Sequence, residues 1–401
     1  MTELRPLRFG AFVAPFHPPS GSATLQLRRN IDLAAHLDHL GFDEIWFGEH
    51  HSGGLEIIPA PEVTIAAAAE HAHHIRFGTG VLSLPFHHPL IAVDRICQLD
   101  HQTRGRVIFG TGPGVLATDS HMMGLDPTAQ RGMQAEALDA IVPLLKGETV
   151  SMKTDWFTLA DARLHLRPYR PEGLEVVAAS TLSPSGSLLA AKHGISLMSL
   201  AAGDAKGFEA LDSNWEIYER ESLALGHLPS REDWRLVSCL FLADTVEEAR
   251  AAIRRHALEM TEYIERTYVT SLVPDASPDE AIDHWIEQGL PGFGRLVVGT
   301  PADAIAHIEA LREKTGGFGT YLINAHDMSS WEARKRSFEL FALEVMPHFQ
   351  GTNRGRQESM EFQRENAEWL KAGFADAVKK AKADYERSRG DRVEARDHPP
   401  T

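Results

Sequence analysis

The chain has 401 residues, of which 43% are hydrophobic and 24% charged, as is ordinary for a globular protein with a sizeable core. Acidic residues outnumber basic ones by 56 to 40, and the formal net charge of −16 argues against nucleic acid and anionic membranes as partners. Two cysteines in apolar surroundings, Cys97 and Cys239, are expected to be reduced core thiols. The first residues lack the features of a signal peptide, and no apolar run reaches the ~20 residues of a membrane span. We therefore expect a cytoplasmic enzyme.

Short apolar runs alternate with longer amphipathic segments along the first 350 residues. Strands are expected at residues 7–13, 44–48, 75–84, 107–110, 174–179, 195–200, 236–243, 296–298 and 320–324. Helices are expected at 23–40, 62–74, 89–103, 127–146, 184–193, 206–225, after Thr245, after Pro301 and at 330–347. Two excursions, 148–173 and 260–295, interrupt the alternation, and both are expected to line the ligand pocket. Short strands are expected at 156–157 and 164–166 in the first, and irregular structure over 261–294 in the second.

This order of elements predicts a parallel sheet, because parallel strands need crossover helices to connect them. About eight such units without a break in composition favour a closed (β/α)8 TIM barrel with insertions over an open sheet. We expect residues 1–350 to form the barrel and 351–401 a charged, helical C-terminal extension. That extension is either a solvated helix with a frayed end or an arm packed on the barrel or on a second subunit, since Trp369 and Phe374 need cover.

Functional groups follow the predicted strands, as expected at the carboxyl edge of a barrel. The run Ile45-Trp46-Phe47 stops at Gly48 and leads directly into Glu49-His50-His51. Later strands end in Thr79-Gly80-Val81, in Gly110-Thr111-Gly112-Pro113-Gly114 and in Ser180, which precedes Ser183-Pro184-Ser185-Gly186.

Two of these segments are candidates for cofactor binding. Ser183, Ser185 and Gly186 at the start of a helix would present free N–H groups and the positive end of the dipole to a phosphate, although a plain capping segment has the same composition. The glycine-rich loop at 110–114 has the spacing Gly-x-Gly-x-Gly rather than that of a Rossmann fold. We expect its backbone, at Thr111 and Gly112, to pass close to a flat ligand or to a neighbouring strand.

The paired histidines at 50–51, 73–74 and 87–88, with His71, raise the question of a metal site. The helical spacing typical of zinc is absent, and adjacent histidines at a strand end point to opposite sides. We therefore predict no metal site and assign His50 an acid/base or hydrogen-bonding role, because imidazole titrates near neutrality. His51, on the other side, is expected to be structural.

An ordered set of motifs makes residues 5–350 resemble the bacterial luciferase-like flavin-dependent monooxygenases. The motifs are LRFGAF at 7–12, GFDEIWFGEHH at 41–51, FGTGVLSLP at 77–85 with His88-Pro89, GRVIFG at 105–110, SPSG at 183–186, GTP at 299–301 and EVMP at 344–347. Within the family, the order of Asp126-Pro127, the WFTL run at 156–159, the LRP run at 166–168 and SPSG looks most like the limonene monooxygenase-type branch.

The resemblance implies a two-component monooxygenase. Reduced FMN (FMNH2), supplied by a separate NAD(P)H:flavin reductase, would react with O2 to a C4a-(hydro)peroxide, and one oxygen atom would enter a small apolar substrate of the terpene, ketone or aldehyde type. His50 matches the catalytic histidine beside the flavin, with Glu49 tuning it, and Gly80-Val81 matches a non-proline cis peptide behind the flavin ring. Ser183, Ser185 and Gly186 match the phosphate side, and Ser180, at the preceding strand end, is also expected to bind the cofactor. A homodimer through the early helices is also implied.

The sequence departs from this pattern at Gly112-Pro113, where luciferase itself has Cys-Arg. The reactive-loop cysteine and a phosphate-binding arginine are therefore missing, and Arg131 is a candidate to compensate for the arginine. Three alternatives remain open: a deazaflavin-dependent oxidoreductase transferring hydride, as in related barrels, a non-catalytic flavin-binding or storage protein, and a metal hydrolase.

Overall fold

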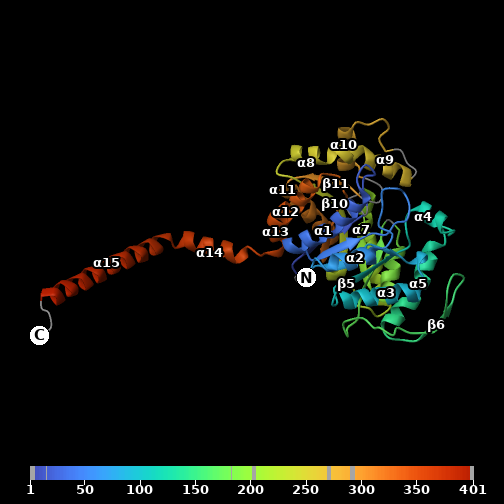
Figure 1. The fold of residues 1–401 in the computed structure, drawn as a ribbon, viewed down its shortest axis with the longest axis horizontal. Coiled ribbons are helices and arrows are strands. Elements are labelled where there is room, and N and C mark those ends of the chain that lie inside the picture. The colour runs from blue at the N-terminus through green and yellow to red at the C-terminus, as the bar shows by residue number, and fades with distance from the viewer. Residues whose placement is uncertain are drawn as a thin grey trace. The chain divides into compact units, whose positions relative to one another are not determined.

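A closed barrel of parallel strands forms the centre of the computed structural model, which describes residues 5–14, 16–181, 183–200, 205–268, 272–289 and 294–397 (Figure 1). Each strand pairs in parallel with the next, and the last pairs with the first. The strands of the barrel are β1 (Arg8–Val13), β2 (Glu44–Phe47), β3 (Arg76–Thr79), β5 (Val107–Gly112), β8 (Glu175–Ser180), β9 (Ser196–Ser199), β10 (Trp234–Leu242) and β12 (Thr320–Asn324). The predicted (β/α)8 barrel is confirmed.

Helices connect the strands and cover the outside of the barrel. They are α1 (Ala23–Leu40), α2 (Pro61–Ala69), α3 (Pro89–Gln102), α4 (Ala117–Met122), α5 (Gln130–Leu145), α6 (Ser185–His193), α7 (Ala205–Ala224), α11 (Pro301–Thr315), α12 (Trp331–Leu340) and α13 (Met346–Gln350). Helix α1 ends where the sequence predicts, because Gly41 adopts a left-handed φ of 82° that favours glycine. Single-turn segments lie at Leu84–Phe86 (with β4, Leu82–Ser83), Arg231–Asp233, Arg254–His256 and Phe341–Val345.

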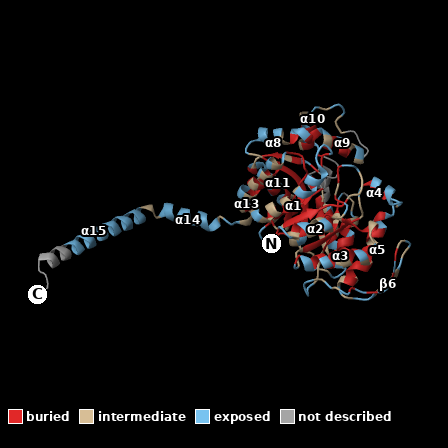
Figure 2. Ribbon diagram, viewed as in Figure 1, coloured by how far each residue is buried: buried red, intermediate tan, exposed pale blue. Residues whose placement is uncertain are grey.

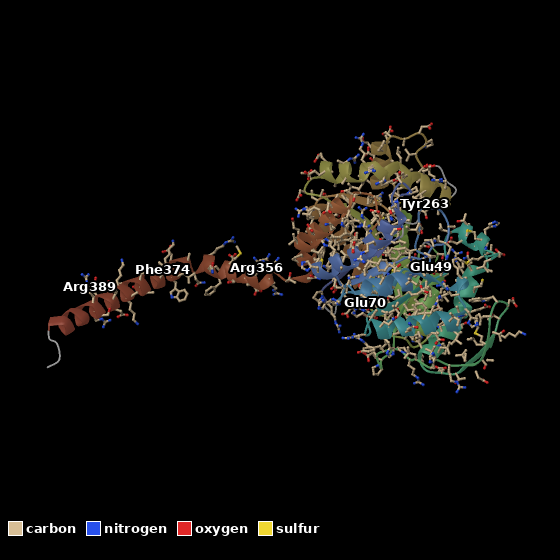
Figure 3. The ribbon with its side chains drawn as sticks, in the orientation of Figure 1. Glu49, Glu70, Tyr263, Arg356, Phe374 and Arg389 are labelled. Atoms are coloured by element: carbon tan, nitrogen blue, oxygen red, sulfur yellow. The ribbon has the colours of Figure 1, made fainter. Side chains whose placement is uncertain are left out.

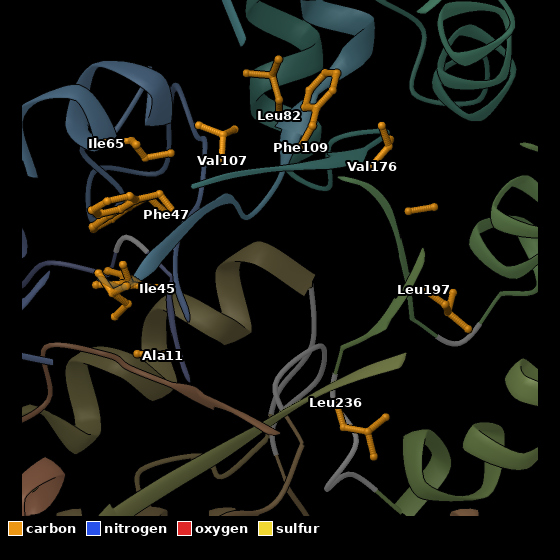
Figure 4. Packing of buried hydrophobic residues seen from close by; sticks show 14 of the residues in the cluster. Ala11, Ile45, Phe47, Ile65, Leu82, Val107, Phe109, Val176, Leu197 and Leu236 are labelled. Atoms are coloured by element: carbon orange, nitrogen blue, oxygen red, sulfur yellow. The ribbon is translucent and has the colours of Figure 1, made fainter. Parts of the chain in front are cut away.

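The alternation of side chains along each strand separates two hydrophobic layers. Residues pointing into the barrel form one cluster: Phe12, Ala14, Trp46, Ile108, Val177, Met198, Val237 and Leu322. Their neighbours in sequence point outward and pack beneath the helices, among them Ala11, Ile45, Phe47, Val107, Phe109, Val176, Leu197 and Leu236 (Figure 4). The interior is thus a packed core, which leaves function to the strand ends.

An ion-pair network lies at the amino ends of the strands. The fully buried guanidinium of Arg235 donates to both carboxylate oxygens of Glu44 at 2.8 Å and approaches Glu175 at 2.8 Å. The indole N–H of Trp46 donates to Glu44 at 3.0 Å, so this carboxylate has several partners. The network ties β2, β8 and β10 together at the end of the barrel opposite the strand ends discussed below.

The second excursion was predicted incorrectly as irregular. It contains α9 (Ala257–Tyr268) and α10 (Pro278–Glu287), which with α8 (Val246–Ile253) pack around a separate apolar cluster that includes Met260, Ile264 and Trp285. Strand β11 (Leu296–Gly299) pairs with the upper half of β10 and belongs to the sheet but not to the closed barrel. A small helical lobe therefore stands beside the carboxyl ends of the strands (Figure 1).

Two further boundaries differ from the prediction. The first excursion is a hairpin of β6 (Val150–Lys153) and β7 (Thr158–Ala162), so Trp156 and Phe157 lie in its turn rather than in a strand, and residues 164–166 form no strand. Helix α5 begins at Gln130 instead of 127, because the Asp126 carboxylate accepts hydrogen bonds from the backbone and hydroxyl of Thr128 and stabilises a preceding turn.

The chain divides into two compact units, Met1–Gln350 and Gly351–Thr401. The second unit consists of α14 (Arg354–Glu365) and α15 (Ala367–Asp397). Its described side chains are largely exposed, including Trp369 and Phe374, which are 67% and 73% exposed (Figure 2). No helix in the described part of the chain is long and apolar enough to cross a membrane.

Candidate functional site

A cavity of about 190 Å³ opens at the carboxyl ends of the barrel strands. Its wall includes residues from the ends or following loops of β1, β2, β3, β5, β8, β9, β10 and β12, and from α5 and α9. Glu49 and Tyr263, both labelled in Figure 3, belong to this wall. Eight of the ten residues proposed from sequence as catalytic or cofactor-binding also line it: Glu49, His50, Gly80, Val81, Gly112, Ser180, Ser183 and Ser185. Thr111 and Gly186 do not.

His50 lies between two carboxylates in this cavity. Its Nδ1 forms a hydrogen bond of 3.0 Å with Asp119 Oδ2. Its Nε2 lies 2.9 Å from Glu56 Oε2, which is ion-pair distance, but the angles do not allow a hydrogen bond. Asp119 comes from α4 and Glu56 from the loop after β2. The ring is therefore approached by opposite charge on both nitrogens.

Asp119 is held as a carboxylate. Burial alone would raise its pKa, but hydrogen bonds from His50 and Ser52 and the backbone N–H of His51 outweigh burial and lower the pKa. Because an ionised carboxylate only accepts hydrogen bonds, Nδ1 of His50 carries the proton in this contact.

Glu49 belongs to a neighbouring network. It is 2% exposed and accepts hydrogen bonds from His51 Nε2 at 3.0 Å, from His87 Nε2 at 2.6 Å and from the backbone N–H of Ser83 at 2.5 Å. Burial would raise the pKa of Glu49, but these hydrogen bonds outweigh it and lower the pKa, while the Glu49 hydrogen bond raises the pKa of His51. The structure thus pairs Glu49 with His51 and His87, and places Asp119 and Glu56 beside His50.

One wall of the cavity is built from backbone. The Gly80–Val81 peptide is cis, as the family resemblance implies. A Cβ at Gly112 would come within 2.5 Å of Val81 Cγ2, so only glycine lets β5 pass this close. Thr111 is fully buried in β5, and its hydroxyl donates to the Val177 carbonyl at 3.1 Å. This hydroxyl is therefore directed to the neighbouring strand β8 and not to the cavity.

Small hydroxyl side chains and one arginine also line the cavity. Ser183 and Ser185 share a hydrogen bond of 2.8 Å at the start of α6, and the Ser180 hydroxyl donates to the Ser183 carbonyl at 3.2 Å. Gly186 lets α6 approach β8, because a Cβ there would meet the Ala179 carbonyl at 2.3 Å. Arg131, at the start of α5, is the one Arg or Lys among the described residues of the wall.

Besides Glu56 Oε2, which faces His50 Nε2, two buried polar atoms in the wall have no hydrogen-bond partner among the described residues. They are Nε2 of Gln134 on α5 and Oδ1 of Asn324 at the end of β12, whose side chains are 2% and 5% exposed. An unpaired buried donor or acceptor costs about 1–3 kcal/mol. Both atoms are thus available to hydrogen-bond a ligand.

The first excursion does not contribute to this wall, contrary to the expectation that both excursions line the pocket. Only the second does so, through Tyr263 and Thr267 of α9. In the described part of the chain, no three His, Cys, Asp or Glu side chains converge as they would to hold a metal ion.

Sequence analysis missed Glu56, Asp119 and Tyr263 as site residues. Asp119 follows the glycine-rich loop after β5, and a rule that titratable residues soon after each barrel strand are candidates would have found it. Glu56 and Tyr263 carry no comparable signal, because one lies within a long loop and the other within a helix that was not predicted.

Comparison with known proteins decides the family. The sequence profile of the family described as luciferase-like monooxygenase matches residues 7–317. The chain belongs to the luciferase-like monooxygenase family. This membership confirms the resemblance seen in the sequence, and the protein is a flavin-dependent monooxygenase.

Among relatives, limonene 1,2-monooxygenase of Rhodococcus erythropolis is 42% identical over 380 residues, which cover 94% of this chain and 96% of that protein. Among solved structures, the oxygenating constituent of 3,6-diketocamphane monooxygenase from Pseudomonas putida, a type II Baeyer–Villiger monooxygenase in complex with FMN, superposes with a TM-score of 0.67 at 26% identity. It covers 85% of this chain and 98% of its own. An F420-dependent secondary alcohol dehydrogenase shares the fold at a TM-score of 0.63 and 19% identity, covering 83% and 97% of the chains.

Proposed function

We propose that the protein is the oxygenase component of a two-component system that uses FMNH2 and O2 to insert one oxygen atom into a small apolar organic substrate. The observation that carries the proposal is the construction of one cavity, whose described lining combines a histidine between two carboxylates, a wall of backbone, several serine hydroxyls and one arginine. The similar 3,6-diketocamphane enzyme was solved with FMN, which supports FMN as the flavin.

The residues present fit FMN. The ring would lie against Gly80, Val81 and Gly112, where the missing side chain at position 112 leaves room for Val81 to form part of this wall. The unpaired Gln134 Nε2 and Asn324 Oδ1 would hydrogen-bond the polar edges of the flavin or its ribityl chain.

The phosphate would lie at the end formed by Ser183, Ser185 and Arg131. The start of α6 presents backbone N–H groups and the positive end of the helix dipole to an anion, and the two hydroxyls add donors. Arg131 supplies the positive charge that luciferase places in its glycine-loop position. Ser180 and Gly186 would position the start of α6 rather than touch the phosphate. Thr111 would hold β5 in place rather than touch the flavin.

Reduced FMN, when bound, would supply the two electrons with which one atom of O2 enters the substrate and the other leaves as water. The chain's own part is to exclude water and to manage a proton. His50 carries a proton on Nδ1 toward Asp119, and its Nε2 side faces Glu56 within the cavity. It is the acid/base group in the wall with the means to donate a proton to a ligand or accept one. Glu49 would act indirectly, by fixing His51 and the loop that carries His50.

The substrate we propose is a terpene, ketone or aldehyde. The cavity wall beyond the polar groups is apolar, with Phe12, Val115, Leu116, Leu200 and Val237. Such a wall selects by burying apolar surface and excludes water from the reaction. The 42% identical relative is named for oxygenating limonene, a terpene, which supports this class.

FMNH2 would come from a separate NAD(P)H:flavin reductase. The 3,6-diketocamphane structure is described as an oxygenating constituent, which supports a second component for this protein as well. We also propose a homodimer through the early helices, where Val63 of α2 and Ile91 of α3 are exposed apolar side chains. Sedimentation at the monomer mass would contradict the dimer.

The decisive experiment supplies the protein with FMN, NADH, a flavin reductase and ¹⁸O2 in the presence of a panel of terpenes, ketones and aldehydes. We expect a product that carries one ¹⁸O atom. Substrate oxidation or reduction that needs a reduced deazaflavin and no O2 would instead establish hydride transfer, and flavin binding without turnover would indicate a storage protein.

The role of His50 is tested by His50→Ala. We expect turnover to fall by about 100-fold or more, the usual contribution of a general acid or base, while FMNH2 binds within about twofold of the wild type. Unchanged turnover would remove His50 from the mechanism.

A further inference from the structure

Glu56 is a second buried acid in the cavity wall, and its two oxygens have different partners. Its Oε2 lies 2.9 Å from His50 Nε2 and accepts no hydrogen bond from the described residues, while its Oε1 accepts a hydrogen bond from the Tyr263 hydroxyl. The residue is 7% exposed, so the carboxylate cannot rely on water for its solvation.

Tyr263 is itself fixed. It is 3% exposed, its ring packs at 5.8 Å from that of Phe16, and the backbone of Gly53 runs against it, so that a Cβ at Gly53 would lie 3.4 Å from the ring. Tyr263 comes from α9 in the helical lobe, whereas Asp119, on the other side of His50, comes from α4. The series of contacts Asp119–His50–Glu56–Tyr263 thus connects α4 to α9 through the imidazole of His50.

We propose that Glu56 and Tyr263 are positioning residues for His50, and that through them α9 sets the orientation of the imidazole toward the ligand. A buried carboxylate with one firmly hydrogen-bonded oxygen has little freedom to rotate, and its other oxygen then holds the ring. Without the tyrosine hydroxyl, Glu56 turns and the ring adopts further orientations, which slows proton transfer more than it weakens binding.

The other groups facing His50 are accounted for. Asp119 holds Nδ1, Glu49 is directed to His51 and His87, and Arg131 lines the same cavity. Glu56 is therefore the acid whose removal changes the charge at Nε2.

This inference rests on the proposed function for its kinetic test, so the experiment has a second arm that needs no flavin. The variants are Tyr263→Phe and Glu56→Gln, with Tyr218→Phe as a matched control. Tyr218 is also a buried tyrosine with one hydrogen bond, from its hydroxyl to the Ile195 carbonyl at 3.1 Å, but it lies outside the cavity wall.

In the kinetic arm, we expect kcat of Tyr263→Phe to fall about tenfold, as for loss of one hydrogen bond to a charged group, with KM and FMN affinity within about twofold. In the flavin-free arm, ¹⁵N NMR follows the His50 ring, assigned by the loss of its signal in His50→Gln. Glu56→Gln and Tyr263→Phe should both change the ¹⁵N chemical shift of Nε2, because the first removes the carboxylate beside that nitrogen and the second removes the hydrogen bond that holds the carboxylate. Tyr218→Phe should change neither readout.

Two results would overturn the inference. One is an unchanged ¹⁵N chemical shift of His50 in Glu56→Gln together with an unchanged kcat in Tyr263→Phe. The other is a loss of thermal stability alone, with the same ¹⁵N spectrum and pH–rate profile, which would make the pair packing residues. If the wild type oxygenates nothing, the proposed function fails, whereas the NMR arm still decides the role of Glu56 and Tyr263.

Discussion

Replacing Arg131 by alanine tests the cofactor site most directly. Arg131 is the one Arg or Lys among the described residues of a wall that also holds Glu49 and Glu56, in a chain of net charge −16. A flavin phosphate bound there would depend on this guanidinium for its charge. A hydrogen bond to a charged group contributes about 1.5–3 kcal/mol, and because Arg131 is exposed we take the lower value, which corresponds to about tenfold in Kd.

The assay is fluorescence titration of wild type and Arg131→Ala with FMN and, in parallel, with riboflavin, which lacks the phosphate. We expect FMN to bind about tenfold more weakly to the variant and riboflavin to bind equally to both. Arg163→Ala, at an exposed site beside the β6–β7 hairpin, makes the same change in net charge away from the cavity and serves as control. Equal weakening of FMN and riboflavin, or no weakening of either, would refute the assignment of Arg131 to the phosphate.

Three further predictions concern the barrel. Arg235→Met leaves the Glu44 carboxylate buried without its charge partner, and we expect urea denaturation to show a loss of about 3–5 kcal/mol; a loss below about 1 kcal/mol would contradict this. Burial would raise the pKa of Glu175, but Arg235 and a second arginine outweigh it and lower the pKa to about 2, so its stabilisation is complete above about pH 4.5 and is lost as the pH falls toward 2. Between pH 5 and 2.5, the free energy of unfolding should therefore depend less on pH in Glu175→Gln than in the wild type. An equal dependence on pH in the two proteins would contradict this prediction. Gly112→Ala forces Val81 to move, because the new Cβ would lie 2.5 Å from it, and FMN should bind at least about fivefold more weakly by titration, consistent with the 1–3 kcal/mol of overpacking.

The sequence predicts the barrel well because each barrel strand is a continuous apolar run with a clear end. It fails where tertiary packing decides. Residues 261–294 look irregular from their turn-forming composition, yet α9 and α10 fold around Met260, Ile264 and Trp285. Strand β11 has the same pattern as a barrel strand, and only its pairing with the upper half of β10 places it outside the barrel.

The same limit applies to the site. The sequence predicts that His50, Gly80 and Ser183 meet at one edge of the barrel, because each lies at or soon after the end of a strand, and all three line the cavity. Glu49, adjacent to His50 in sequence, is predicted to tune it, but its carboxylate accepts hydrogen bonds from His51 and His87 instead. Adjacency is a poor guide in extended chain, since successive side chains point to opposite sides and partners come from elsewhere.

That alternation also explains why three consecutive titratable residues serve two networks. Glu49 and His51 point to one side, where they join His87, and Arg95 donates to His87 Nδ1 at 3.0 Å, so that the loops after β2 and β3 are tied together. His50 points to the other side, into the cavity, where it contacts Asp119 of α4 and Glu56 from the later part of its own loop. The two networks share only the backbone of this segment and the contact from the His51 N–H to Asp119. Glu49 and His51 would therefore keep His50 in place by holding the loop, while its proton is governed by Asp119 and Glu56.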